Sequence, residues 1–261
     1  MALMNLININ GTQLEVQKVS PNPLSEGLAP LVFLHEGLGS VALWRDWPAQ
    51  LCAATGRVGW VYSRRGYGQS EAIPDVRGGG QLKPDYLHHE AWTVLPALLQ
   101  ALAIKQPVLV GHSDGGSIAL LHASRHNVSA CVVIAPHTLV EDVSVKAIEA
   151  ARIGFESGAL RERLLRFHAD VDGAFWQWND IWLNPAFREF DIRGECTRIK
   201  APVLAVQGVN DPYGSLQQIE QITLPSTQIT RLILQECGHS PHREQAVLTT
   251  QAIQQFLASA P

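Results

Sequence analysis

The sequence predicts an α/β protein built around a mainly parallel sheet, with one helical segment inserted between two of its strands. Short apolar runs alternate with longer stretches of helical spacing, which is typical of successive β-α-β units. The chain has 261 residues, of which 46% are hydrophobic and 17% charged, so it is long enough for a single large core. From Glu141 to Phe190 only helical stretches occur, and this break in the alternation predicts the insertion.

The first elements are expected to form an antiparallel pair. Leu3 to Val19 alternates loosely in polarity and turns at Asn10-Gly11, a dipeptide that suits a tight hairpin. The elements expected next are a strand over 31–34, a helix over 41–55, a strand over 58–62, a surface loop over 70–84 and an amphipathic helix over 86–104.

The second half of the chain continues the alternation on both sides of the insertion. The expected elements are a strand over 108–110, a helix over 117–122, a strand over 130–135, inserted helices over 145–155, 160–168 and 175–183, strands over 202–207 and 230–235, and a last helix over 245–257. The carboxyl ends of parallel strands share one crevice, so reactive side chains of one site are expected in the loops that follow the strands.

One of these loops contains the pattern G-x-S-x-G. Gly111-His112-Ser113-Asp114-Gly115 lies between a buried strand and a helix, the context in which this pattern presents a serine on a strained turn. Glycines flank the serine because a Cβ atom would clash there. We therefore predict that Ser113 is a nucleophile, and that His112, inside the turn, shapes it.

A serine hydroxyl needs a base, and the base needs an orienting carboxylate. Asp211 follows the strand over 202–207, and His239 follows the last strand on a turn supported by glycine. We predict that Asp211 orients His239 and that His239 is the base. His242 is the nearest alternative base, but it follows a proline and is expected on the first helical turn.

Acyl transfer also requires backbone N–H groups that stabilise an oxyanion. One donor is expected to be the amide of Asp114, the residue after the nucleophile. The loop over 35–39 is expected to supply the second, from Gly37 or alternatively from Leu38.

Composition limits the partners of this chain. The formal net charge of -4 and the absence of a basic stripe argue against nucleic acid, and no apolar run reaches the ~18 residues of a membrane span. The cysteines have no C-x-x-C spacing, which suits a reducing compartment and argues against zinc. We expect a cytoplasmic protein, a monomer or homodimer, that acts on a small molecule without a cofactor or metal.

These motifs together resemble the capped serine hydrolases of the α/β-hydrolase superfamily. The resemblance is carried by His35-Glu36-Gly37-Leu38-Gly39, by Arg65-Gly66-Tyr67-Gly68-Gln69-Ser70, by the segment from Gly111 to Gly116, by Asp211 and by Gly238-His239. It implies an eight-stranded, mostly parallel sheet with helices on both faces. It further implies a core formed by 1–136 and 192–261, and a helical lid over 137–191 after the sixth strand.

The chain departs from the family pattern at two positions. Glu36 stands where the family often has glycine, so its carboxylate is expected either to contact substrate or to point into the lid. Ser63 stands where an aspartate is usual, which puts a structural contact in question. Ser113 itself disfavours a haloalkane dehalogenase or an epoxide hydrolase, since those enzymes would carry aspartate there.

The function expected from these residues is hydrolysis of an ester of a small or medium apolar substrate through an acyl-enzyme. C–C bond hydrolysis, lactone opening and amide hydrolysis, including aminopeptidase action, remain open on the same triad, as does a non-catalytic receptor of the same fold. The side chains expected to contact substrate are Glu36, Leu38, His112, Trp176 and Trp182. Further aromatic residues expected over the pocket are Phe167, Phe175, Trp178 and Phe187.

Overall fold

The computed structural model describes residues 4–224 and 229–259, and these form an α/β protein around a single eight-stranded sheet. The strand order is β1-β2-β4-β3-β5-β6-β7-β8, and every neighbouring pair from β4 to β8 is parallel. The strands are β1 (Met4–Ile9), β2 (Thr12–Val19), β3 (Leu31–Leu34), β4 (Gly59–Tyr62), β5 (Val108–His112), β6 (Ala130–Ile134), β7 (Val203–Gly208) and β8 (Ile229–Leu234). The predicted fold class is confirmed.

The amino-terminal hairpin forms where the sequence predicts it. β1 and β2 pair antiparallel, with Ile9 opposite Thr12, and Asn10 and Gly11 make the turn with φ values of 52° and 88°. Two consecutive positive φ values define the turn type that favours Asn-Gly, which explains the agreement.

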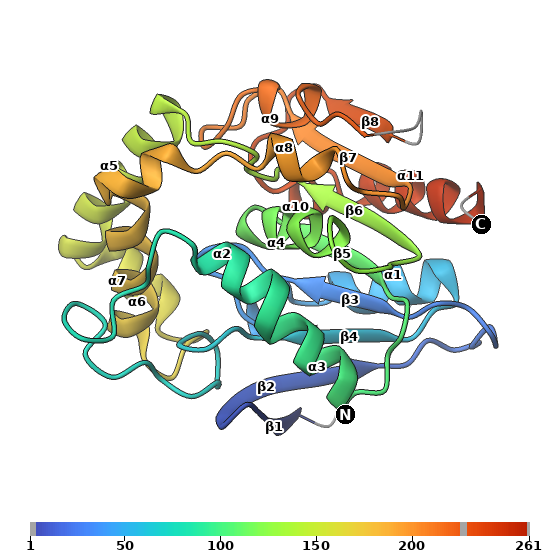
Figure 1. Cartoon of the computed structure of the whole chain (residues 1–261), viewed down its shortest axis with the longest axis horizontal. Coiled ribbons are helices and arrows are strands. Elements are labelled where there is room, and N and C mark those ends of the chain that lie inside the picture. Colours follow the sequence, from blue (N-terminus) through green and yellow to red (C-terminus); the bar gives the residue numbers. More distant parts are fainter. Residues whose placement is uncertain (1–3, 225–228, 260–261) are drawn as a thin grey trace.

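The parallel strands are buried on both faces by helices. In β3, Leu31 and Phe33 pack into one core cluster, and Val32 and Leu34 pack into the other. The first cluster includes residues of α1 (Trp47–Thr55) and α11 (Ala246–Ser259); the second includes residues of α3 (Leu95–Ala101) and α4 (Asp114–Ala123). In Figure 1 these helices lie behind and in front of the sheet, respectively.

The helix expected over 86–104 is interrupted. It consists of α2 (Tyr86–His89), the π-helical turn η2 (Glu90–Val94) and α3, with Pro96 at the start of α3. Proline has no N–H group and its ring clashes with the carbonyl four residues earlier, so a wider turn before it relieves the conflict.

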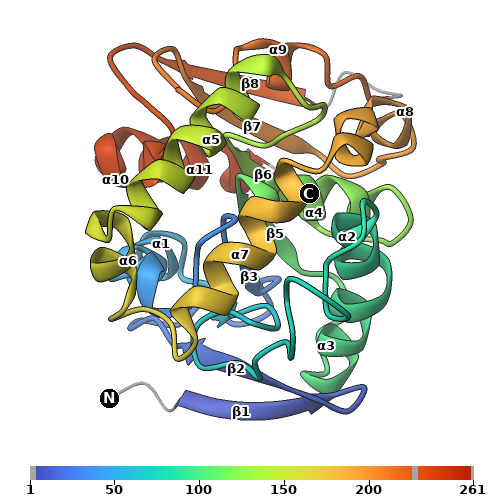
Figure 2. The same cartoon turned by 90° about the vertical axis from the view of Figure 1, so that its left-hand side faces the viewer.

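Helices alone occupy the chain between β6 and β7. They are α5 (Asp142–Glu156), α6 (Ala159–Leu164), α7 (Val171–Trp182), the 3-10 helix η3 (Pro185–Glu189) and α8 (Arg193–Cys196). An isolated antiparallel bridge joins Leu139 to Asp191 at the base of the segment. α5, α6 and α7 lie beyond the carboxyl ends of the parallel strands (left in Figure 1, front in Figure 2). The lid boundaries at 137 and 191 stay a prediction.

The remaining short elements connect the strand ends to the helices. They are η1 (Ala42–Trp44), α9 (Gln217–Glu220) and α10 (Pro241–Glu244), which carries His242 on its first turn as expected. Among residues 4–224 and 229–259, no helix has both the length and the apolar character that a membrane span requires.

Candidate active site

Ser113 lies on a strained turn between β5 and α4. Its φ of 53° and ψ of -119° are unusual for a residue with a side chain. The turn is tight: a Cβ atom on Gly115 would lie 1.9 Å from the Leu34 carbonyl oxygen, and one on Gly111 would lie 2.2 Å from the Gly115 carbonyl oxygen. Glycine is therefore required at both positions, and the serine is the turn residue whose side chain reaches the cavity described below.

Asp211 and His239 meet at the carboxyl edge of the sheet, although they follow different strands. The Nδ1 atom of His239 lies 2.8 and 2.9 Å from the two carboxylate oxygens of Asp211. A carboxylate only accepts hydrogen bonds, so Nδ1 carries the proton and Nε2 is left as the acceptor for a hydroxyl. This is the tautomer that a catalytic base requires.

The Asp211 carboxylate is held by further donors. The amide of Tyr213 donates to it at 2.8 Å, and the Gln207 side-chain amide donates at 2.7 Å. Burial alone would raise the pKa of Asp211, but the hydrogen bond and charge of His239 together with the Tyr213 amide hold this pKa below its ordinary value. The carboxylate thus stays ionised and fixes the imidazole.

Ser113 and His239 line one cavity of about 160 Å³, here called the Ser113 cavity. Its other lining residues are Glu36, Gly37, Leu38, His112, His137, Ile148, Trp178, Trp182, Tyr213 and Ser240. Within the described ranges no hydrogen bond joins the Ser113 hydroxyl to His239. Such bonds are often long before substrate binds, so the shared cavity is the relevant observation.

The loop over 35–39 contributes the wall opposite His239. The buried guanidinium of Arg64 donates to the carbonyl oxygens of His35, at 2.6 Å, and Glu36, at 3.1 Å. These bonds fix the direction of the peptide groups next to Gly37, which lines the cavity so closely that a Cβ atom there would lie 2.1 Å from Nε1 of Trp178. The amides of Gly37 and Leu38 both stay candidates for the oxyanion hole.

Glu36 faces the sheet side of the cavity and not the inserted helices. Its carboxylate oxygens lie 3.3 Å from Nδ1 of His112 and 3.3 Å from Nη2 of Arg243 on α10. Burial would raise the pKa of Glu36, but these neighbours lower it well below the ordinary value. His112 also donates from Nε2 to the His239 backbone carbonyl at 2.7 Å, so it helps to fix the backbone of the predicted base.

The side chain of Asp114 connects the turn to the inserted segment, a role that the sequence analysis did not assign. Its carboxylate accepts hydrogen bonds from Tyr86 Oη at 2.8 Å and from Nε1 of Trp182 at 3.2 Å, and Nη2 of Arg64 lies 3.5 Å away. Burial raises the pKa of this carboxyl group despite Arg64. Its backbone amide is at the amino end of α4, where helices leave N–H groups free for an oxyanion.

One residue predicted to contact substrate lies away from the Ser113 cavity. Trp176 does not line the Ser113 cavity; its ring lies 3.9 Å from the guanidinium carbon of Arg77 on the outside of α7. Trp178 and Trp182 are four residues apart and share the inner face, and Trp176 is two residues from Trp178 and so points elsewhere. Of the other expected aromatic residues, Phe175 and Phe187 are fully buried in the core.

Several cavity residues carry no motif that sequence reasoning could find. They are His137, Ile148, Tyr213 and Ser240. His137 directly follows Pro136 at the end of β6, and burial lowers its pKa to about 3. The one sequence signal that could have predicted this residue in the site is its position in a loop that follows a strand.

The replacement of aspartate by Ser63 is compensated by a neighbouring strand. The Ser63 hydroxyl donates to Glu15 of β2 at 2.7 Å and accepts from the amide of Val41 at 2.9 Å. Glu15 also accepts from the amide of Gln69 at 2.9 Å. A buried carboxylate thus still anchors the loop after β4, although it comes from another strand.

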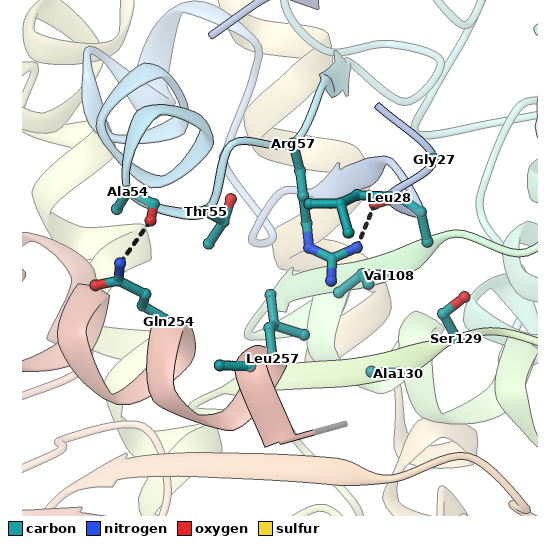
Figure 3. Close-up of a pocket in the computed structure, with 12 residues that line it drawn as sticks. Gly27, Leu28, Ala54, Thr55, Arg57, Val108, Ser129, Ala130, Gln254 and Leu257 are labelled. Carbon is teal, nitrogen blue, oxygen red and sulfur yellow. Dashed lines mark hydrogen bonds between the residues drawn. The ribbon is translucent and has the colours of Figure 1, made fainter. Parts of the chain in front are cut away.

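A larger cavity of about 580 Å³ lies at the amino ends of β5 and β6, at the other end of these strands from Ser113 (Figure 3). Its polar side chains are already bonded to the protein: Arg57 donates to the Ala29 carbonyl at 2.8 Å, and Gln254 donates to the Ala54 carbonyl at 2.7 Å. It contains neither Ser113 nor His239, so its volume does not make it the candidate active site.

The fold and this site together define the class of protein. A serine at a strand-turn-helix bend on a mostly parallel eight-stranded sheet, with an Asp–His pair on later strand ends, is the arrangement of α/β hydrolases. The chain belongs to the alpha/beta hydrolase family, whose model matches residues 31–252.

Solved structures agree on the fold. The enol-lactonase from Burkholderia xenovorans LB400 has a TM-score of 0.74 and 19% identity, over 98% of this chain and 100% of that one. An alpha/beta hydrolase fold protein from Chitinophaga pinensis has a TM-score of 0.76 and 18% identity, over 99% and 98%. The proline iminopeptidase of Mycobacterium smegmatis has a TM-score of 0.71 and 18% identity, over 98% of both chains. At these identities the likeness establishes the shared fold.

Proposed function

We propose that the protein is a serine hydrolase that cleaves an ester of a small, mainly apolar acid. Ser113 is the nucleophile, His239 the general base and Asp211 the group that orients it. The observation that carries the proposal is the 2.8 Å contact between His239 and Asp211 beside the cavity that both His239 and Ser113 line.

The geometry supports a two-step acyl transfer. The Ser113 oxygen attacks the ester carbonyl carbon while its proton passes to Nε2 of His239. The oxyanion is stabilised by the amide of Asp114 and by that of Gly37 or Leu38. When the tetrahedral intermediate collapses, the C–O bond breaks and His239 gives its proton to the departing alcohol. Water then attacks the acyl-enzyme with the same base, and the acid is released.

The walls of the Ser113 cavity support a small apolar acyl group. Leu38, Ile148, Trp178 and Trp182 supply its apolar surface, and the volume of about 160 Å³ leaves little room for a long chain. The Glu36 carboxylate already accepts a hydrogen bond from the Arg243 guanidinium at 3.3 Å, so it does not favour a cationic substrate. For that reason ester hydrolysis is better supported than aminopeptidase action.

Labelling with a fluorophosphonate tests the proposal directly. The folded protein should be modified at Ser113, as read by mass spectrometry of its peptides, and Ser113→Ala should not be modified. Para-nitrophenyl acetate and butyrate should be hydrolysed faster than the octanoate. A folded protein that takes up no label would contradict the proposal and favour a binding protein of the same fold. Hydrolysis that survives in Ser113→Ala would contradict it by showing that another group is the nucleophile.

A further inference from the structure

His168 connects the inserted helical segment to the loop over 35–39. It lies between α6 and α7, is 4% exposed and does not line the Ser113 cavity. Its two ring nitrogens contact two different loops: the amide of Gly68 donates to Nδ1 at 3.0 Å, and Nε2 lies 3.0 Å from the carbonyl oxygen of Leu38. These partners are 100 and 130 residues away along the chain, so one buried side chain joins three segments of the molecule.

The partners of His168 determine where its proton lies. A backbone N–H group only donates, so Nδ1 accepts from Gly68 and carries no proton. A carbonyl oxygen only accepts, so Nε2 carries the proton and donates to Leu38. Burial lowers the pKa of His168, while its hydrogen bond to Leu38 and the charges of Glu36 and Asp170 oppose the shift. The imidazole is therefore neutral at neutral pH, with one tautomer that satisfies both nitrogens.

The position of His168 is fixed by the loop that follows β4. The amide of Ala169 donates to the Gly68 carbonyl oxygen at 2.8 Å, so both backbone polar groups of Gly68 are bonded to the inserted segment. Gly68 has a φ of 58°, and a Cβ atom there would lie 2.2 Å from Oε2 of Glu15. The same carboxylate accepts from the amide of Gln69, the next residue. His168 is thus held against a tightly packed loop while it donates to the loop that follows β3.

The loop over 35–39 has glycine on both sides of Leu38. Gly37 and Gly39 have no Cβ atoms, so the peptide groups between them can rotate at little steric cost. A rotated peptide group would direct a carbonyl oxygen, instead of an N–H group, into the Ser113 cavity. An oxyanion hole is effective when its N–H groups are already directed at the oxygen before the reaction. The loop therefore requires bonds from outside that fix its peptide groups.

Two buried side chains supply these bonds from opposite ends of the loop. Arg64 donates to the carbonyl oxygen of Glu36, in the peptide group that carries the Gly37 amide. His168 donates to the carbonyl oxygen of Leu38, in the peptide group that follows. The Leu38 amide belongs to the peptide group between these two. Both candidate donors of the oxyanion hole thus lie between carbonyl groups that buried side chains hold.

We infer that His168 is a positioning residue of the oxyanion hole. Through its hydrogen bond to the Leu38 carbonyl, the inserted segment keeps the amides of Gly37 and Leu38 directed at the oxygen of the tetrahedral intermediate. His168 lies outside the Ser113 cavity, so it acts through the loop and not as an acid or base. The inference rests on the proposed serine hydrolysis and adds a role for the inserted segment in stabilising the oxyanion.

Trifluoroacetone is a suitable probe because its adduct carries the oxyanion. The Ser113 oxygen adds to the carbonyl carbon, the hydroxyl proton passes to Nε2 of His239, and the ketone oxygen becomes an oxyanion in the hole. Its inhibition constant, measured against para-nitrophenyl acetate, therefore reports how well the hole is formed. The value of kcat/KM for that ester reports the same interaction in the transition state.

Two amide variants separate the two bonds of His168. In His168→Asn the shorter side chain reaches the position of Nδ1, so it can accept from Gly68 but cannot donate to Leu38. In His168→Gln the side-chain amide reaches the position of Nε2 and can still donate to Leu38. His168→Asn should lower kcat/KM and the affinity for trifluoroacetone by the same factor, about 10²-fold. His168→Gln should change each by less than about threefold.

His122 provides the matched control for the loss of a buried histidine. It lies in α4, is 2% exposed and bonds through Nδ1 to the Ala91 carbonyl at 2.9 Å, away from the loop over 35–39. His122→Asn should lower the melting temperature and leave kcat/KM and the affinity for trifluoroacetone unchanged. If His122→Asn lowers both as His168→Asn does, the losses reflect general destabilisation and the inference is overturned.

The His168 variants can also overturn the inference by themselves. It fails if folded His168→Asn keeps kcat/KM within about threefold of the unaltered protein, or if kcat/KM falls while trifluoroacetone binds as before. It also fails if His168→Gln loses as much as His168→Asn. If His168→Asn does not fold, His168→Gln decides the matter, because an affinity for trifluoroacetone reduced about tenfold or more would show that the bond to Leu38 is not what counts.

Failure of the proposed function gives a different result. An unaltered protein that takes up no fluorophosphonate and hydrolyses no ester contradicts serine hydrolysis itself. If the unaltered protein is labelled at Ser113 and the His168 variants bind trifluoroacetone as it does, serine hydrolysis stands and only the role of His168 is wrong.

Discussion

The two cavities beside Asp114 differ in size and in how their polar groups are connected. The Ser113 cavity, of about 160 Å³, is lined by the His239 imidazole, which is hydrogen-bonded to Asp211. His112 donates a hydrogen bond to the backbone carbonyl of His239. A second cavity, of about 510 Å³ and here called the Tyr67 cavity, is lined by Tyr67, by Gln177 of α7 and by residues of the π-helical turn η2, and neither Asp211 nor His239 lines it. Arg64 and Tyr86 line the larger cavity and contact Asp114, the neighbour of Ser113, so this cluster lies between the two.

The comparison shows that volume and chemistry are separate properties of a cavity. A large apolar space indicates where a molecule fits, and pairs of titratable groups with fixed geometry indicate where it reacts. In this molecule neither residue of the Asp–His pair lines the two larger cavities, and His239 of that pair lines the smallest of the three cavities described. The largest expected effect is on the Asp–His pair beside the Ser113 cavity, followed by the Asp114 cluster between the cavities and then by His137.

Asp211→Asn should give the largest difference between the cavities. The amide would present an N–H group to His239 or to the Gln207 side chain, so the imidazole would lose the tautomer that accepts the serine proton. We expect kcat for para-nitrophenyl acetate to fall about 10⁴-fold.

A surface aspartate provides the matched control for this change. Asp142→Asn removes an exposed carboxylate that pairs with Arg188, and exposed pairs contribute little, so kcat should stay as in the unaltered protein. If Asp211→Asn keeps more than a tenth of kcat, another group orients His239 and the proposed triad is incorrect.

Asp114→Asn alters the cluster that lies between the two cavities, and its expected effect, a loss of stability, is smaller than the loss of activity in Asp211→Asn. The carboxylate accepts from Tyr86 and Trp182 and balances Arg64, whose side chain is 5% exposed. Hydrogen bonds to buried charged groups contribute about 1.5–3 kcal/mol, so the free energy of unfolding in urea should fall by about 2 kcal/mol.

The control for the Asp114 variant is a carboxylate outside both cavities. Asp180 pairs with the more exposed Arg77 and Arg152, and Asp180→Asn should cost less than about 1 kcal/mol. Equal losses in the two variants would mean that the Asp114 cluster contributes no more to stability than a surface pair.

Local sequence patterns predicted the elements that local chemistry determines. The Asn10-Gly11 turn and the bend at Ser113 require particular backbone angles, and the residues that adopt them are few. The family match and the sheet order confirm the fold that these signals imply. The residues assigned to the triad lie together in the structure, and their catalytic role stays a prediction.

Other features depend on contacts that no single segment encodes. The choice between Trp176 and Trp178 depends on the rotation of α7 against the sheet, which hydrophobicity alone did not distinguish. The Tyr67 cavity is assembled from segments far apart in the chain, such as β1 and α7. The π-helical turn in the helix after Asp85 arises from Pro96 within an otherwise regular apolar pattern, so the sequence predicted one continuous helix.

Acid should lower the free energy of unfolding through His137, which lines the Ser113 cavity. Burial lowers the pKa of His137 to about 3, with the nearby His239 and His112 adding to the shift and Asp211 opposing it. In the unfolded chain a histidine has a pKa near 6.5. Below about pH 6.5 the unfolded state therefore binds a proton that the folded state refuses, and stability falls as the pH drops towards 3.

At neutral pH the effect of His137 on the free energy of unfolding is the smallest of the three predicted effects, and it grows as the pH falls. His137→Leu should reduce the pH dependence of the free energy of unfolding between pH 6 and pH 4 by up to about 1.4 kcal/mol per pH unit, measured by urea denaturation at each pH. His126→Leu, which alters an exposed imidazole, should change the slope less. An unchanged slope in His137→Leu would show that His137 takes up its proton in the folded protein, and that the Ser113 cavity is more accessible to water than its burial implies.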